Sequence, residues 1–209
     1  MSHFVGLVFV NEDESNLDFN LECYNEQDEK YFEFEDRTEE LEEKFNSLPE
    51  KDERLTEDGK PWAYPCDKEH YPTIEKLAED WYGYHYDEDA HAYGYAYNPS
   101  AKWDWYSIGG RWSGWLFDKA EGHEYNMLKF DDVDWEKMFA EDWNHVPFCV
   151  VDTDGGWHEK GEMGRFAFVS NEKGEDEWAD EVTHYVQTIA NLPDEKRANI
   201  MVYVVDFHI

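Results

Sequence analysis

The sequence has few cysteines, few cations and no long apolar run, and each shortage excludes a class of protein. Three cysteines in 209 residues, without CxxC spacing, exclude a disulfide framework and indicate reduced thiols in a cytoplasmic protein. No apolar run approaches the roughly 18 residues of a membrane span, and the start MSHFVGLVFVNEDE predicts no signal peptide. With 18 Lys and Arg against 51 Asp and Glu, direct binding to nucleic acid is disfavoured, because it requires cations.

The motifs of several common enzyme classes are also absent. The chain contains no GxSxG, HExxH, GxGxxG or GxxxxGK[ST], so neither a nucleophile elbow nor a nucleotide-binding loop is expected. Cys149 lies in the apolar run FCVV and is predicted to be core. The sequence therefore identifies no catalytic group and no cofactor, and leaves open whether the chain is an enzyme.

The net charge of −33 has three interpretations. It can provide solubility or reflect a salt-rich or acid-biased host, attract a basic partner, or imitate nucleic acid. Duplex DNA carries one charge per roughly 1.7 Å, so this excess would match on the order of 55 Å of duplex if it gathered on one face. A hydrophobic content of 41% and an aromatic content of 18% exclude a disordered polyanion.

Residues 11–60 hold 20 acidic and 6 basic residues and are predicted to form an acidic insertion or lobe within a single domain spanning residues 1–209. Alternation in YFEFED predicts a half-exposed strand at 31–36. A capping box of Asp36 and Glu39 predicts a helix that ends before Pro49. The acidic side chains of this strand and helix are the candidate partner-binding residues: Glu33, Glu35, Asp36, Glu39, Glu40, Glu42 and Glu43.

Periodicity elsewhere predicts an α+β fold with a single antiparallel or mixed sheet and helices mainly on one face. The expected strands are 4–10, 112–117, 148–151, 157–160, 165–169 and 200–207. The expected helices are 73–82, 131–143 and 175–192. The stretch 81–97 is rich in tyrosine, and its rings are expected either to cover a sheet edge or to form a stacking platform for a base or sugar.

The stretch 98–117 reverses the local charge to +1 and holds four of the ten tryptophans. An extended segment would place Lys102, Asp104 and Tyr106 on one face, with Trp103 and Trp105 in the core. The main-chain N–H groups of a glycine pair, beside cations, suit an anionic or carbonyl-bearing ligand. The candidate ligand-binding residues are Lys102, Asp104, Tyr106, Gly109, Gly110, Arg111 and Glu162. The alternative is a tight hairpin in which Arg111 pairs with Asp104.

The chain ends carry a second candidate site. Asp206 and His208 share a face of the last predicted strand, and His3 precedes the first. If these strands pair, the three side chains converge, with Glu162 as a possible fourth group. Such a set suits a divalent metal or general acid–base chemistry.

The blocks MSHF, YNPSAKWDWYSIGGRWSGWL, GEMGRFAFVSNEK and VVDFHI, roughly a quarter of the chain, resemble an uncharacterised family found in phage and bacterial genomes. The family has no settled activity, so the resemblance implies a shared fold and a common site and no particular reaction. It implies that the following residues belong together: His3, Lys102, Asp104, Gly109, Gly110, Arg111, Glu162, Gly164, Asp206 and His208.

Two functions are therefore expected as alternatives. The first is an acidic interaction protein, such as a phage-encoded anti-CRISPR or nucleic-acid mimic, that binds a basic surface of a host nucleic-acid-binding defence enzyme in the host cytoplasm. The second is a protein or enzyme that binds a phosphate or nucleotide in a cleft formed by Lys102, Asp104, Arg111 and Glu162. A structural or regulatory role without a ligand remains open.

Overall fold

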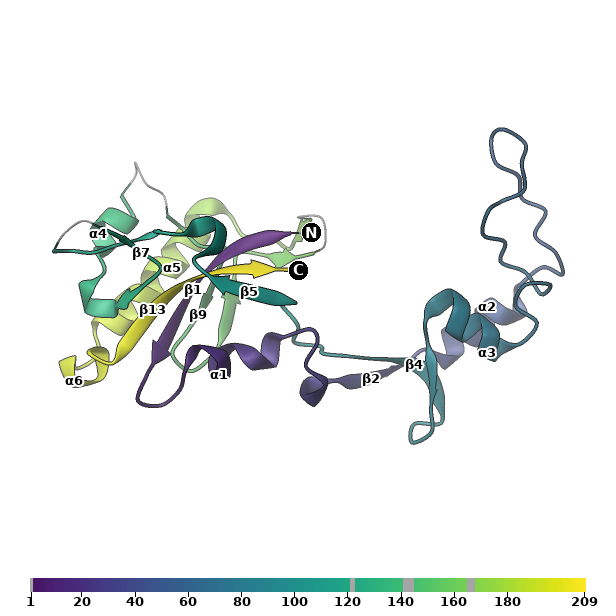
Figure 1. Cartoon of the computed structure of the whole chain (residues 1–209), viewed down its shortest axis with the longest axis horizontal. Coiled ribbons are helices and arrows are strands. Elements are labelled where there is room, and N and C mark those ends of the chain that lie inside the picture. Colours follow the sequence, from purple (N-terminus) through teal and green to yellow (C-terminus); the bar gives the residue numbers. More distant parts are fainter. Residues whose placement is uncertain (1, 121–122, 141–144, 165–167) are drawn as a thin grey trace. The chain divides into compact units, whose positions relative to one another are not determined.

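The chain folds as two compact units in an α+β architecture, the predicted class (Figure 1). The computed structural model describes residues 2–120, 123–140, 145–164 and 168–209. Unit 1 comprises Met1–Asp28 and Ser100–Ile209, and unit 2 comprises Glu29–Pro99. Among the described residues, no helix combines the length and apolarity that crossing a membrane requires.

The boundaries of unit 2 differ from those of the predicted acidic insertion, since residues 11–28 belong to unit 1 and residues 61–99 to unit 2. Unit 2 carries 21 Asp and Glu against 8 Lys and Arg, a net charge of −13. Unit 1 carries 30 against 10, a net charge of −20. Both units are therefore acidic, and the early acidic run in the sequence does not delimit either of them.

A mixed sheet organises unit 1 around the two terminal strands. β1 (His3–Asn11) and β13 (Ile200–His208) pair antiparallel along their whole length, as predicted. Further strands extend the sheet on both sides: β9 (Cys149–Val151), parallel to β1; β10 (Trp157–Glu159), antiparallel to β9; and β5 (Trp105–Ile108) and β8 (Met127–Lys129), antiparallel to β13. Chain ends 200 residues apart in sequence thereby become central neighbours.

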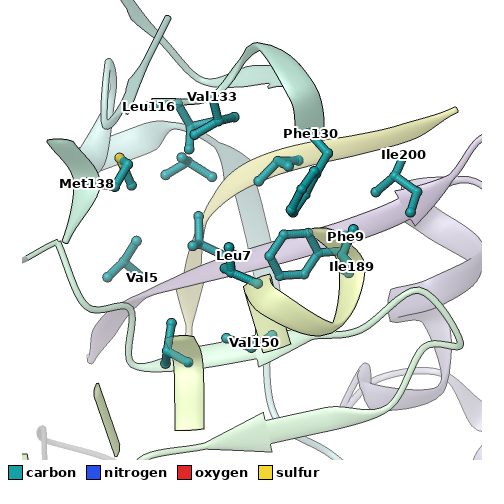
Figure 2. Close-up of a cluster of buried hydrophobic side chains, with 14 of the residues drawn as sticks. Val5, Leu7, Phe9, Leu116, Phe130, Val133, Met138, Val150, Ile189 and Ile200 are labelled. Atoms are coloured by element: carbon teal, nitrogen blue, oxygen red, sulfur yellow. The ribbon is translucent and has the colours of Figure 1, made fainter. Parts of the chain in front are cut away.

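Alternating side chains of β1 bury both faces of this sheet, which explains its nearly uninterrupted apolar sequence. Leu7 and Phe9 pack with helix α5 (Glu175–Ala190), together with Phe130 and Met138 (Figure 2). The opposite face packs against helix α1 (Leu17–Leu21). The longest helix thus lies on one face, in agreement with the predicted arrangement.

The remaining elements of unit 1 are short. They are α4 (Trp135–Met138), α6 (Asp194–Arg197), β6 (Leu116–Phe117), β7 (Glu124–Tyr125), β11 (Glu162–Met163), β12 (Val169–Ser170) and the 3-10 turns Glu22–Tyr24, Gly110–Trp112 and Phe130–Asp132. The predicted strand 112–117 is wrong over its first half, because the backbone turns at Gly114 (φ +81°). The predicted helix 131–143 extends, among described residues, only over α4; residues 141–144 lie outside them, as do 165–167 of the predicted strand 165–169.

Unit 2 packs a small antiparallel sheet against helices. The strands are β2 (Glu33–Asp36), β4 (Ala92–Tyr97) and β3 (His85–Asp87), with β4 in the middle. The helices are α2 (Thr38–Asn46), α3 (Ile74–Leu77), a π-helical turn at Ala78–Tyr82 and a 3-10 turn at Glu29–Tyr31. Leu41, Leu48 and Leu77 form the core. The predicted helices after Asp36 and Thr73 are confirmed, and the Thr73 hydroxyl caps the second one. The predicted capping box is not formed, because α2 begins at Thr38 with Arg37 in the N-cap position and no side-chain cap hydrogen bond.

Candidate functional site

Two histidine–carboxylate pairs meet at the end of the main sheet where both chain termini lie. The Nδ1 atom of His3 lies 2.8 Å from Oδ1 of Asp206, and Nδ1 of His208 lies 2.5 Å from Oδ1 of Asp104. The antiparallel register pairs His3 with His208, and the two-residue period of β13 places Asp206 on the same face. The predicted convergence of His3, Asp206 and His208 is confirmed. We call these four side chains the terminal His–Asp cluster.

The cluster is buried and packed between aromatic rings. Asp206 is 2% exposed and His208 is 4% exposed. Trp105 stacks on the His208 ring at 4.9 Å with an interplanar angle of 17°, while His3 meets that ring edge-on at 4.9 Å. Nε2 of His208 is buried without a hydrogen-bond partner. If Nδ1 donates to Asp104, the neutral ring presents Nε2 as an unused acceptor.

The main-chain N–H that follows the glycine pair binds a carboxylate of the chain itself. The main-chain N–H of Arg111 donates to Oδ2 of Asp206 at 2.9 Å. Gly110 (φ +49°) permits this approach, since a Cβ atom there would lie 2.4 Å from the same oxygen. Asp206 therefore occupies the N–H of Arg111, and binding of a ligand at the glycine pair remains a prediction. The alternative Arg111–Asp104 pair is not formed, because Asp104 pairs with His208 and the Arg111 side chain is exposed.

Replacing Gly110 with alanine is expected to break the contact between Arg111 and Asp206. The left-handed backbone costs any alanine about 1–2 kcal/mol, and loss of a hydrogen bond to a buried carboxylate adds about 1–3 kcal/mol. Gly155→Ala is the matched control, because Gly155 has φ +81° with its nearest atom 3.7 Å from the ideal Cβ. Urea unfolding of both variants measures the difference, and equal losses of stability would show that the Asp206 contact contributes nothing.

Three other predicted ligand-binding residues contact side chains outside the terminal His–Asp cluster. Nζ of Lys102 pairs with Glu159 at 2.5 Å, and Glu162 is exposed and accepts hydrogen bonds from Ser170 and Asn171 at 3.2 Å. The Tyr106 hydroxyl donates to Asp18, and burial together with this carboxylate raises the tyrosine pKa. Lys102, Tyr106 and Glu162 thus have partners other than the terminal His–Asp cluster.

The prediction that Trp105 is core is wrong, whereas Trp103 is buried as expected. Trp105 is 45% exposed. The chain bends at Asp104, so β5 begins only at Trp105 and the assumed alternation is broken there. Tyr106 consequently packs edge-on against Trp103 at 5.1 Å and does not share a face with Asp104. Sequence reasoning therefore missed that Trp105 packs against the terminal His–Asp cluster. Only knowledge of the bend at Asp104 would have indicated this position of Trp105.

Metal binding at the cluster remains a prediction. Within the described ranges, no group of three His, Cys, Asp or Glu side chains is arranged to hold a metal ion. Cys149 is buried in β9, and this burial raises the pKa of its thiol well above the usual value. A thiolate at Cys149 is therefore disfavoured, in agreement with the predicted core role.

The candidate partner-binding residues lie together on β2 and α2 of unit 2. Arg37 pairs with Glu35 at 2.5 Å and with Glu40 at 3.0 Å. Asp36 accepts the Thr38 N–H at 2.8 Å, and this hydrogen bond lowers the pKa of its carboxyl group. Among these candidates, the exposed carboxylates that make no ion pair are Glu33, Asp36, Glu39, Glu42 and Glu43.

The tyrosines of the 81–97 stretch stack mainly on one another. Tyr84 stacks on Tyr82 at 5.0 Å and on Tyr95 at 5.7 Å. Tyr82, Tyr84 and Tyr93 also pack against the core of unit 2. The stretch itself supplies β3 and the central strand β4, so these rings pack on one another and on the core, and no contact shows them covering a sheet edge. A stacking platform for a base or sugar remains a prediction.

Sequence reasoning also missed a cationic and aromatic hollow in unit 2. It has a volume of about 470 Å³ and is lined by Lys44, Arg54, Trp62, Tyr64 and Trp81. Arg54 lies over the Trp62 ring at 5.4 Å and pairs with Asp52 at 2.5 Å. The aromatic residues of the PWAYP segment were the available signal, but the segment has no periodicity that would bring them together.

Comparison with known proteins adds no relative from which a role can be transferred. No protein-family model, no curated protein and no solved structure matches the chain significantly.

Proposed function

We propose that the chain is an acidic interaction protein that binds a basic surface of a partner protein through β2 and α2 of unit 2. The observation that carries this proposal is the row of unpaired carboxylates on α2. Glu39, Glu42 and Glu43 are exposed and have no ion pair in unit 2, although Arg37 lies at the start of the same helix. Like charges three and four residues apart on a helix repel one another. A basic partner relieves this repulsion.

The pairing of the cations supports the same proposal. Five of the eight Lys and Arg side chains of unit 2 form ion pairs with acidic residues of the same unit: Arg37, Lys51, Arg54, Lys60 and Lys76. The exposed charge left over is negative, and such a surface steers a basic partner and accelerates its association.

Imitation of nucleic acid is the specific form of the proposal. At one charge per roughly 1.7 Å of duplex, the net charge of unit 2 corresponds to about 22 Å of DNA. The resemblance expected from the sequence, to an uncharacterised family of phage and bacterial genomes, extends the proposal to inhibition of a host nucleic-acid-binding defence enzyme in the host cytoplasm. Binding of the protein and binding of DNA to such an enzyme would then exclude each other.

Neutralising the helix carboxylates by Glu39→Gln, Glu42→Gln and Glu43→Gln is expected to weaken binding to the partner on the order of tenfold at low salt. Most of this loss should appear in the association rate, because exposed charges act mainly through steering. A DNA-binding partner is first captured by zero-length cross-linking of its lysines to the carboxylates of this protein. Surface plasmon resonance then measures its binding to the original chain and to the variant at increasing salt concentrations.

A matched control neutralises three exposed acids of α5 in unit 1, namely Asp176, Glu177 and Asp180. This variant changes the net charge by the same amount and is expected to bind normally. Equal weakening by both variants would show a general effect of charge and contradict the proposed surface. A ternary complex with DNA would contradict imitation of nucleic acid while leaving the interaction surface intact.

A further inference from the structure

A cavity of about 290 Å³ opens beside His3 in unit 1. Its apolar walls include Trp112, Phe148, Met163 and Trp178. The Trp178 indole N–H donates to the Pro147 carbonyl at 2.6 Å, so the polar group of this wall is already satisfied. The volume lies just below the usual range for ligand pockets of roughly 300–1,000 Å³. This volume is large enough for a molecule with one aromatic ring, since an apolar cavity of about 150 Å³ already holds benzene.

The charged groups at this cavity leave its one lysine fully paired. Nζ of Lys160 lies 2.8 Å from Glu175 and 2.9 Å from Glu172. Hydrogen bonding to Glu175 raises the pKa of Lys160, so the lysine stays protonated and paired. No spare positive charge therefore remains in the described lining to hold an anion, and the surrounding net charge of −33 repels anions at long range. An uncharged occupant fits these conditions.

His3 supplies the polar anchor of the cavity. Its Nδ1 is held by Asp206, which in turn accepts the Arg111 main-chain N–H. This chain of hydrogen bonds orients the ring, in the way that a carboxylate orients a histidine in metal and catalytic sites. Nε2 of His3 makes no hydrogen bond to any described residue and is the ring nitrogen left to accept one.

We infer that this cavity binds a small uncharged aromatic molecule carrying one hydroxyl group, and that the hydroxyl donates a hydrogen bond to Nε2 of His3. The ring packs between Trp112 and Trp178. The site is independent of the acidic surface of unit 2, since its lining lies entirely in unit 1. It also differs from the cleft expected from Lys102, Asp104, Arg111 and Glu162, which do not line it.

Titration of the full chain with 4-methylphenol, followed by the indole N–H signals of Trp112 and Trp178, tests this inference. Saturable shifts at both signals are expected. Toluene, which has the same ring and methyl group but no hydroxyl, should bind about 3–10-fold more weakly, the value of one hydrogen bond. Equal affinities for the two probes, or shifts confined to Trp62 and Trp81 of unit 2, would overturn the inference.

The variant His3→Asn separates the anchor from the scaffold, because the asparagine amide can still donate to Asp206 but offers no equivalent of Nε2. The variant is expected to bind 4-methylphenol and toluene equally, with the affinity that the unmodified chain has for toluene. His158→Asn is the matched control, since His158 also pairs with a carboxylate, Asp152 at 2.8 Å, but does not line the cavity. A persistent preference for 4-methylphenol in folded His3→Asn would contradict the role of Nε2.

Discussion

Replacing Trp178 with alanine is expected to lower the free energy of unfolding of unit 1 by about 3–5 kcal/mol, the usual cost of removing a large buried aromatic side chain. Trp178 is 1% exposed and lies in the core between α5 and the main sheet. Its indole N–H also satisfies the Pro147 carbonyl, which would lose its donor. Denaturant unfolding followed by near-ultraviolet circular dichroism measures this loss.

Trp105→Ala provides the control, because it removes the same side chain from the main sheet at a position that is 45% exposed. We expect it to cost less than half as much, with most of the loss arising from its stacking on His208. A Trp178→Ala variant as stable as Trp105→Ala would contradict the assignment of the core between α5 and the sheet.

Replacing Gly94 with alanine is expected to disrupt unit 2. The added Cβ atom would lie 1.9 Å from the main-chain oxygen of Glu35 and 2.8 Å from the Phe34 ring. Overpacking against movable side chains costs about 1–3 kcal/mol. Here the nearest atom belongs to the backbone of the paired strand β2, so the strands must separate and the cost exceeds that range. Hydrogen exchange of the β2 and β4 amides should accelerate to the rate of unfolded chain.

Gly59→Ala is the comparison within the same unit. Gly59 has φ +76° with nothing within 4 Å of the ideal Cβ, so alanine there meets only the left-handed strain of about 1–2 kcal/mol. Unit 2 is expected to stay folded in this variant. Slow exchange retained at β2 and β4 in Gly94→Ala would show that the two strands are not packed as closely as described.

Periodicity predicted the fold class and the elements whose side chains repeat regularly. The apolar run of β1, the stripe of α5 and the alternation of β13 each carry the pattern that their burial requires. The convergence of His3, Asp206 and His208 followed because pairing of terminal strands brings distant residues into one register. Predicting these features required only local sequence patterns and the assumption that the two terminal strands pair.

The rest depended on departures from regular geometry. The bend at Asp104 reversed the side of the sheet that Trp105 and Tyr106 face, and alternation alone contains no sign of it. The ion pair between Lys102 and Glu159 joins residues 57 positions apart, a separation that a single sequence does not reveal. Charge likewise did not mark the edges of unit 2, because acidic residues are spread over both units.

Unit 2 is inserted between two segments of unit 1 that lie side by side. The main-chain N–H of Lys102 donates to the Tyr24 carbonyl at 2.8 Å, and the N–H of Glu26 donates to the Trp103 carbonyl at 2.8 Å. The chain thus leaves and re-enters unit 1 at almost the same point, as in proteins that accept inserted domains. Such a junction makes unit 2 exchangeable: a different domain could be grafted there while the terminal His–Asp cluster and its sheet keep their own fold.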